Sequence, residues 1–295
     1  MLKAESLLAQ TKGQLRHFNL RARKGLGQHF LTDEGVLNLI ASSADLTASD
    51  VVIEIGPGLG VLSRELAGRA GWLVTIELDS RLVAILKKNL AHFLNVTVIN
   101  DDVLKIDPVA LLQREQTGLP TVASVPLHYK VVANLPYYIT SAVLRHFLEA
   151  SLKPWVMVVM VQKEVAQAIV AGPGQMSLLS ISVQFYAKVE VIEYVPACCF
   201  YPTPKVDSAI LKVVAYPGPA VVVDRDSFFR LVRAGFTASR KQICNSLAHG
   251  LDLPKDEVLS WLVRVGIAPQ RRAETLTLEE WAELWRVFAQ VGGGR

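Results

Sequence analysis

The sequence has few cysteines and shows neither metal-ligand spacing nor a secretion signal. It contains three cysteines among 295 residues, and two of them, Cys198 and Cys199, are adjacent. Adjacent cysteines cannot easily bridge each other without strain, so we expect free thiols in a reducing compartment. No metal site is expected. The basic N-terminus is not followed by an apolar stretch, which argues against a signal peptide.

Long apolar runs are also scarce. The longest uncharged run covers residues 165–187, but it contains Gly172-Pro173-Gly174 and several amide and hydroxyl side chains. A bilayer-spanning helix is therefore not expected, and the predicted location is the cytoplasm. The sequence shows no internal repeat and no heptad seam, so we expect a monomer.

Positive charge is present in moderation and is concentrated at the N-terminus. The net charge is +4, and residues 1–30 hold six Lys or Arg residues against one Glu. An arm with Arg16, Arg21, Arg23 and Lys24 suits phosphate contacts. The alternative is a solvated, partly disordered tail.

Strand and helix patterns alternate along the first two thirds of the chain. Strands are predicted at 51–55, 72–78, 96–99, 129–133 and 155–161, and helices at 33–44, 60–69, 81–93, 141–150 and from about 163. This alternation predicts βαβ units and a parallel sheet covered on both faces. Segments 178–195 and 208–216 are predicted to form an antiparallel pair at one edge.

The pattern changes after the linker signal Tyr216-Pro217-Gly218-Pro219. Residues 228–247, 255–265 and 277–291 are all predicted to be helical. We therefore predict three parts: a basic arm (1–24), an α/β domain (25–219) and a small all-helical domain (220–295).

A glycine-rich loop follows the first predicted strand. It has the spacing G-x-G-x-G, directly after an acidic residue, whereas a dinucleotide fold favours G-x-G-x-x-G. A carboxylate would repel a pyrophosphate but suits a cationic, methionine-like group. Further acceptors follow the next two strands, where they suit ribose hydroxyls and an adenine amine. The residues concerned are Glu54, Gly56, Gly58, Gly60, Glu77 and Asp102. Together they favour a nucleoside cofactor.

The fourth strand ends in Asn134-Leu135-Pro136-Tyr137. An adenine amine is a poor nucleophile because its lone pair is delocalised into the ring. Methylating it requires acceptors on its hydrogens, which the Asn134 side chain and the Leu135 carbonyl can provide, while Tyr137 can stack on the base. The alternative is a plain turn with a core aromatic residue.

This tetrapeptide resembles the N-[IL]-P-Y motif of the ribosomal RNA adenine N6-dimethyltransferases. Four further segments are similar to that family in the same order, from about residue 20 to 245: Gly25-Leu26-Gly27-Gln28-His29-Phe30-Leu31, Glu54 to Gly60, Gln162-Lys163-Glu164-Val165-Ala166 with Pro173-Gly174 downstream, and Phe200 to Ser208. The resemblance implies a Rossmann-like class I methyltransferase sheet with a small C-terminal helical domain. It also implies S-adenosylmethionine as the methyl donor, without a metal.

The resemblance also implies a role for each matching residue. Gln28, His29 and Leu31 would close over the cofactor, and Gly56 and Gly58 would bind its methionine part. Glu77 would bind the ribose and Asp102 the adenine. Asn134 would lie beside both the sulfonium methyl of the cofactor and the target amine, which Leu135 and Pro136 would also surround. Tyr137 and Phe200 would clamp the extruded base. Two departures are visible: His29 stands where the family usually has Asn, and Ser239-Arg240-Lys241 has one basic residue fewer than the common R-R-K run.

Within this family the chain is most similar to enzymes that modify two adjacent adenines in the 3′-terminal hairpin of small-subunit rRNA. The implied partner is therefore small-subunit rRNA or an immature small ribosomal subunit, with a role in assembly. The alternatives are a large-subunit rRNA adenine methyltransferase of the antibiotic-resistance type, a non-catalytic assembly factor and a nicotinamide-dependent oxidoreductase. The loop spacing and the lack of a hydride-transfer constellation disfavour the last.

Overall fold

The computed structural model describes residues 5–116 and 128–292, and the chain divides into two compact units. The first comprises residues 1–166 and 188–215, and the second comprises residues 167–187 and 216–295. The predicted boundary at 219/220 is close to one of these divisions, but the second unit also takes in residues 167–187. Within the described residues, no helix is both long and apolar enough to cross a membrane.

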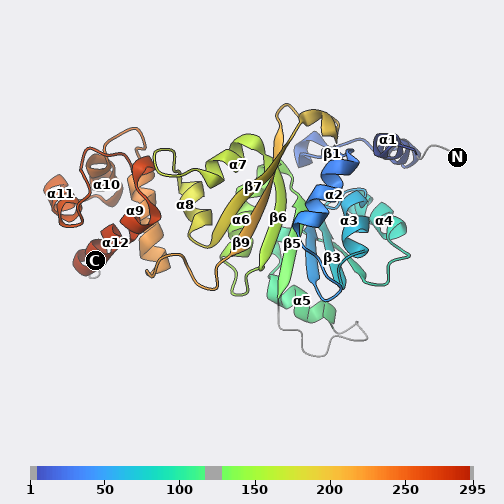
Figure 1. Cartoon of the computed structure of the whole chain (residues 1–295), viewed down its shortest axis with the longest axis horizontal. Helices are drawn as coiled ribbons and strands as arrows, with labels where there is room; N and C mark the ends of the chain where they lie inside the picture. Colours follow the sequence, from blue (N-terminus) through green and yellow to red (C-terminus); the bar gives the residue numbers. More distant parts are fainter. Residues whose placement is uncertain (1–4, 117–127, 293–295) are drawn as a thin grey trace. The chain divides into compact units, whose positions relative to one another are not determined.

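The first unit is built on a seven-stranded sheet with the order β4-β3-β2-β5-β6-β9-β7 (Figure 1). Its strands are β2 (Val51–Ile55), β3 (Trp72–Glu77), β4 (Val96–Asn100), β5 (Tyr129–Asn134), β6 (Val156–Gln162), β7 (Ala187–Val195) and β9 (Ser208–Ala215). The first five pair in parallel, and β9 is antiparallel to β6. The predicted fold class, a mostly parallel sheet with an antiparallel edge, is confirmed.

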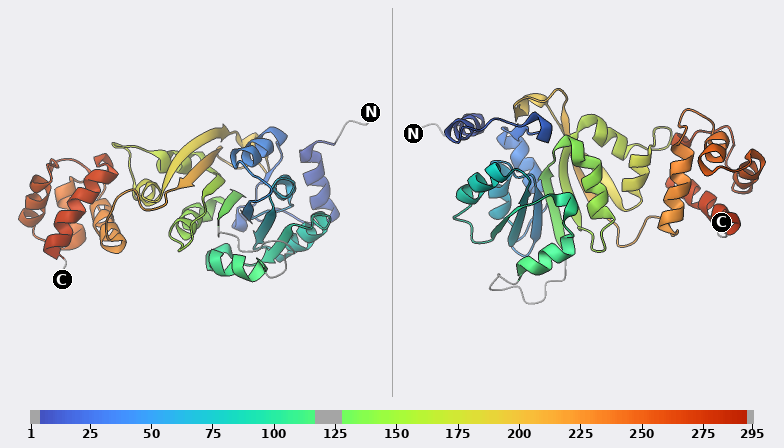
Figure 2. Two further views of the ribbon diagram at one scale, coloured as in Figure 1. Left: turned by 60° about the horizontal axis from the view of Figure 1, so that its bottom comes forward. Right: turned by 180° about the vertical axis from the view of Figure 1, so that it is seen from behind.

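Helices cover both faces of this sheet, as Figure 1 and its reverse view in Figure 2 show. They are α2 (Glu34–Ser43), α3 (Val61–Ala67), α4 (Ser80–Asn89), α5 (Pro108–Gln116) and α6 (Thr140–Leu148). Helix α7 (Lys163–Val170) follows β6 and crosses the division between the two units. Every residue of β2 and β3 is buried, as expected for strands that are covered on both faces. On the side of α2 and α3, Ile40 and Leu66 pack in one core cluster with Val52, Leu73 and Val132 from three strands. This core fixes where the strands end.

The basic arm is neither a tail nor wholly irregular. Helix α1 (Leu7–His17) begins at Ser6, whose side chain accepts a hydrogen bond from the amide of Ala9. Leu15 is buried in a second cluster with Leu59, Leu82 and Ile85, so α1 lies against the first unit. The alternative of a solvated tail therefore does not hold for the described part of the arm, because the arm has enough apolar side chains to dock.

The second unit is helical apart from its connections. It contains α8 (Leu178–Gln184), α9 (Arg225–Phe236), α10 (Ile243–Leu251), α11 (Lys255–Arg264) and α12 (Leu278–Gly292). A single helix was predicted at 228–247, but α9 ends at Phe236 and α10 begins at Ile243. The two helices pack so closely that a Cβ on Gly250 would lie 2.6 Å from the Ala234 Cα. Because Gly250 and Ala234 are small, the chain can reverse direction between α9 and α10 with the two helices in close contact.

The predicted strand at 178–195 was wrong in its first half, which forms α8. Ser177 caps this helix through a capping box with Ser180. A short run of apolar and hydroxyl residues does not distinguish strand from helix by periodicity alone. The capping hydrogen bonds decide it here.

Candidate active site

A cavity of about 260 Å³ opens where four parallel strands end. Strands β2, β3, β4 and β5 all point their carboxyl ends toward it, the usual location of ligand sites in such sheets. The cavity is lined by residues 26–31, 54–59, 61–62, 76–78, 82, 101–104 and 134–139. Eleven of the twelve predicted site residues are among them: Gln28, His29, Leu31, Gly56, Gly58, Glu77, Asp102, Asn134, Leu135, Pro136 and Tyr137.

The glycine-rich loop needs its glycines for conformation and for space. Gly56, Gly58 and Gly60 have φ of +62°, +60° and +82°, in the region that side chains disfavour. At Gly60, the residue before α3, a Cβ would lie 2.7 Å from the Leu86 Cδ1. The loop therefore turns tightly and brings its backbone to the cavity wall.

Glu54 lies beneath this loop and is almost completely buried. The Ser63 hydroxyl donates to its Oε2 at 2.6 Å, while Oε1 has no partner among the described residues. Burial raises the pKa of this carboxyl to about 8, and the neighbouring Glu77 acts in the same direction. At neutral pH the carboxyl is mostly protonated in the free protein, so the sequence-based picture of a standing negative charge needs correction.

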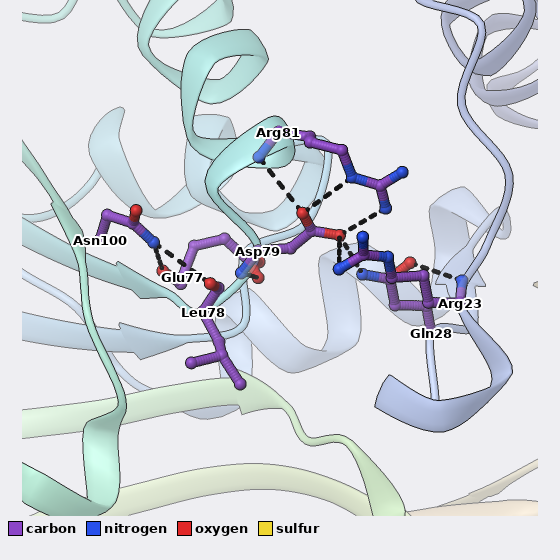
Figure 3. Close-up of polar contacts among 7 residues, drawn as sticks. All are labelled: Arg23, Gln28, Glu77, Leu78, Asp79, Arg81 and Asn100. Atoms are coloured by element: carbon purple, nitrogen blue, oxygen red, sulfur yellow. Dashed lines mark hydrogen bonds and ion pairs between the residues drawn. The ribbon is translucent and has the colours of Figure 1, made fainter.

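Glu77 is held rigidly at the end of β3. Its Oε2 accepts from the Gly58 amide at 3.1 Å and its Oε1 from the Asp79 amide at 2.9 Å. Burial raises the pKa of Glu77, and these backbone donors oppose that rise. The Asn100 side chain donates to the Glu77 and Leu78 carbonyls, which joins the ends of β3 and β4 (Figure 3). Both carboxylate oxygens keep further lone pairs for a ligand.

Asp102 follows β4 and caps the short helix η2 (Val103–Lys105) by accepting from the Leu104 amide at 3.1 Å. Its carboxylate lines the cavity next to apolar side chains that the sequence analysis did not single out. Leu78 and Tyr138 belong to this apolar group and are 49% and 58% exposed, respectively. Large exposed apolar side chains at a cavity mouth suit a flat ring. The available signal was their place in the sequence, because Leu78 directly follows Glu77 and Tyr138 directly follows Tyr137.

The Asn134–Tyr137 segment ends β5 and turns into the short helix η3 (Tyr137–Ile139). The Asn134 Nδ2 donates to the His29 carbonyl at 3.2 Å, which leaves Oδ1 as the acceptor end of the amide. The Leu135 amide donates to the Met160 carbonyl of the neighbouring strand at 3.1 Å. The Tyr137 hydroxyl pairs with the Ser208 hydroxyl at 2.7 Å, which fixes the ring.

The segment around His29 closes the cavity from the N-terminal side. Strand β1 (Phe30–Leu31) pairs antiparallel with β8 (Phe200–Tyr201). The His29 Nδ1 donates to the Pro202 carbonyl at 2.6 Å, and its ring stacks on Tyr137 with centroids 5.8 Å apart. The motifs around residues 25–31 and 200–208, which are far apart in the sequence, are therefore in contact at this side of the cavity.

Phe200 is the one predicted site residue that does not line the cavity. It is 2% exposed and packs in the core cluster that contains Leu31. In this structure the ring that faces Tyr137 is that of His29. A clamp of Phe200 and Tyr137 around a base remains a prediction, and it requires a rearrangement of the buried Phe200 ring.

A parallel sheet with a glycine-rich turn after the first strand and acceptors after the next two defines a class I methyltransferase, the class that uses S-adenosylmethionine. Among the described residues there is no cluster of three metal-ligating side chains.

Comparison with known proteins gives the family. The sequence profile described as ribosomal RNA adenine dimethylase matches residues 19–290. The ribosomal RNA small subunit methyltransferase A of Dehalococcoides mccartyi is 51% identical over 287 residues, covering 97% of this chain and 94% of the relative. A protein of the same name from Alkaliphilus metalliredigens is 42% identical over 285 residues, covering 95% and 96%. The chain belongs to the ribosomal RNA adenine dimethylase family.

Solved structures agree. A dimethyladenosine transferase from Plasmodium falciparum matches with a TM-score of 0.73 at 27% identity, over 90% of this chain and 98% of the other. The 23S rRNA methyltransferase ErmE matches with a TM-score of 0.67 at 28% identity, over 87% and 98%. The predicted enzyme class, an S-adenosylmethionine-dependent rRNA adenine dimethyltransferase, is confirmed, and its family implies S-adenosylmethionine as the donor.

Proposed function

We propose that this protein transfers methyl groups from S-adenosylmethionine to N6 of two adjacent adenines in the 3′-terminal hairpin of small-subunit rRNA. The observation that carries the chemistry is the orientation of Asn134. Its Nδ2 is committed to the His29 carbonyl, so its Oδ1 is the end available to accept from an amine. Relatives at 51% and 42% identity that are named for the small subunit support the choice of substrate.

The cavity residues fit the methyl donor. When bound, S-adenosylmethionine supplies an electrophilic methyl group on a sulfonium centre. Glu77, fixed by two backbone amides, would accept from the ribose hydroxyls. Asp102 would accept from the adenine amine, and the orphaned Oε1 of Glu54 would face the cationic methionine part from beneath the loop. Gly56 and Gly58 would allow the close approach of that part to the backbone.

The same residues would prepare the target amine. Asn134 Oδ1 and the Leu135 carbonyl would accept its two hydrogens and draw the nitrogen toward tetrahedral geometry, which frees its lone pair. Tyr137 would stack on the extruded base. The amine becomes acidic once alkylated and loses its proton readily, so the site needs orientation rather than a strong base. One N–H remains for the second transfer.

The docked N-terminal arm is the proposed contact for the RNA backbone. Helix α1 lies against α4, since the Asn89 Nδ2 donates to the Gln14 Oε1 at 3.4 Å and the Lys88 ammonium lies 5.7 Å from the centre of the Phe18 ring. This places the exposed cations Arg16 and Arg21 on the same side of the unit as the end of α4. Held on a folded element, they lose less entropy when they bind phosphate than cations on a free tail would. The helical second unit is a further proposed RNA contact.

The test is transfer of a labelled methyl group to small-subunit particles that lack the modification, with large-subunit rRNA in parallel. We expect N6,N6-dimethyladenosine in small-subunit RNA only, and a loss of at least about a hundredfold in rate with Asn134→Ala. Label in large-subunit RNA would instead place the protein with the ErmE-like enzymes. Particle binding without label would favour an assembly factor that needs no turnover.

A further inference from the structure

One attachment of the N-terminal wall of the cavity to the rest of the site is a buried carboxylate. Asp79 follows β3 by two residues and its side chain is 2% exposed. It is the N-cap of α4. Figure 3 shows Arg81 reaching it from α4, and Arg23 and Gln28 reaching it from the N-terminal segment. No sequence pattern singled out this carboxylate.

The hydrogen bonds at Asp79 occupy both of its oxygens. Arg81 donates to Oδ1 from its backbone amide and Nε, at 3.2 and 3.1 Å, and to Oδ2 from Nη2 at 2.8 Å. The Gln28 Nε2 donates to Oδ2 at 3.3 Å, and the Arg23 guanidinium lies 3.8 Å away. Hydrogen bonds from Arg81, with a smaller one from Gln28, hold the pKa of Asp79 down to about 2, so the carboxylate is charged at neutral pH.

Both polar atoms of the Gln28 side-chain amide form hydrogen bonds. Its Oε1 accepts from the Arg23 amide at 2.8 Å, and its Nε2 donates to Asp79. This pair of contacts fixes the orientation of the amide and stabilises the turn at residues 23–28. Residues 26–31 follow directly and form one wall of the cavity. The opposite wall includes Glu77, which accepts from the Asp79 backbone amide.

We propose that Gln28 and Asp79 form a positioning pair that holds residues 26–31 against the cofactor cavity, so that the pair sets cofactor affinity by fixing the place of this segment. This rests on the proposed cofactor site and gives Gln28 a positioning role there. The bond is long, at 3.3 Å, but its acceptor is a charged, buried carboxylate, and hydrogen bonds to charged groups contribute more to stability than neutral ones. It joins residue 28 to residue 79, so it also links the closing segment to the strand that carries the ribose acceptor.

The sharpest variant is Gln28→Glu. It has nearly the same shape and still accepts from the Arg23 amide, but it replaces the donor facing Asp79 with a second carboxylate. We expect S-adenosylhomocysteine to bind about tenfold more weakly, as expected for losing a hydrogen bond to a charged group. Trypsin should cut after Arg21 and Arg23 about tenfold faster than in the parent protein, and added S-adenosylhomocysteine should slow this cleavage less than it slows cleavage of the parent.

The double variant Gln28→Glu with Asp79→Asn identifies the pair. Asn remains a good N-cap for α4. Its Nδ2 can donate to the new carboxylate, so the hydrogen bond with residue 28 is restored in the reverse direction, while the contact of Oδ2 with Arg81 Nη2 is lost. We expect both binding and trypsin resistance to return to within about threefold of the parent. A double variant that binds S-adenosylhomocysteine no better than Gln28→Glu alone, and that trypsin cuts as fast, would overturn the proposal.

Arg81→Ala is the matched control, because it removes a partner of the same carboxylate from the α4 side only. We expect a lower melting temperature with unchanged cleavage after Arg21 and Arg23. Equal acceleration of cleavage by Arg81→Ala would mean that Asp79 acts only through α4, and the proposal would fail. Binding of S-adenosylhomocysteine and cleavage by trypsin are both measured without RNA. If these measurements agree with the proposal but the protein methylates no rRNA, only the proposed function is contradicted.

Discussion

The buried carboxyl of Glu54 predicts that cofactor binding is coupled to proton release. In the free protein, burial raises the pKa of this group to about 8, so it is mostly neutral at pH 7. Its Oε1 has no partner among the described residues and lies beneath the loop proposed to hold the cationic methionine part. A cation at that place favours the ionised carboxylate. Binding below pH 8 should therefore expel a proton.

The size of the effect follows from linkage. If the bound state is fully ionised, affinity rises with pH by about ninefold from pH 6 to 7 and about fivefold from pH 7 to 8, and it levels off above. Calorimetry with S-adenosylmethionine at these three pH values measures it. Glu54→Gln keeps the hydrogen bond with Ser63 and removes the titration. At each pH, the affinity of the parent is divided by that of Glu54→Gln. Ionisation of the ligand affects both proteins equally, so it drops out of this ratio.

The pH dependence of folding stability is an independent measure of the pKa of Glu54. Below its unfolded pKa of 4.5, Glu54 is protonated in both states, and its full contribution to stability is present. As pH rises toward 8, the unfolded chain ionises first, so the folded protein loses stability relative to Glu54→Gln. The ceiling of this loss is about 5 kcal/mol. An affinity ratio and a stability difference that both stay flat from pH 6 to 8 would refute a raised pKa at Glu54.

Two further predictions concern the glycine-rich loop and the arm. Gly60→Ala should lower the free energy of unfolding by about 2–4 kcal/mol in urea titrations, because φ is +82° and the new Cβ would meet Leu86. Gly13→Ala is the control: it lies in α1 with nothing within 4 Å of its Cβ, and it should raise stability by about 0.5–1 kcal/mol. Changing Arg16, Arg21 and Lys88 together to Ala should reduce the slope of log affinity for RNA against log salt by about 2–3. An unchanged slope would exclude this surface from the RNA interface.

The sheet and the strand-end acceptors were predictable because they follow from local patterns. Runs such as Val51–Ile55, followed by turn signals and helical periodicity, identify buried parallel strands. Parallel strands bring their carboxyl ends to one edge, so Glu77, Asp102 and Asn134 were expected at the same edge of the sheet. The positions of these three residues needed no knowledge of side-chain contacts.

The features that were missed depend on long-range packing or on single hydrogen bonds. Helix α1 is polar enough to be taken for a tail, and it becomes a docked helix only because Leu15 meets Leu59 and Leu82. The brace between Gln28 and Asp79 joins residues 51 positions apart, and both are of types common on any surface. Phe200 was placed in the cavity by its motif, whereas the structure buries it against the core.

These differences bear on how the site opens. The sheet side of the cavity is fixed by buried strands, which cannot move without unfolding the core. The N-terminal side is anchored by Phe30 and Leu31, which are buried, but residues 23–29 before them are held mainly by polar contacts at their surface. Segments with few buried apolar contacts open at the lowest free energy. We therefore expect the cofactor to enter when residues 23–29 detach from the rest of the unit, with β1 as the hinge. The rate of this opening should depend on the hydrogen bond between Gln28 and Asp79 and on the contact of His29 with Pro202.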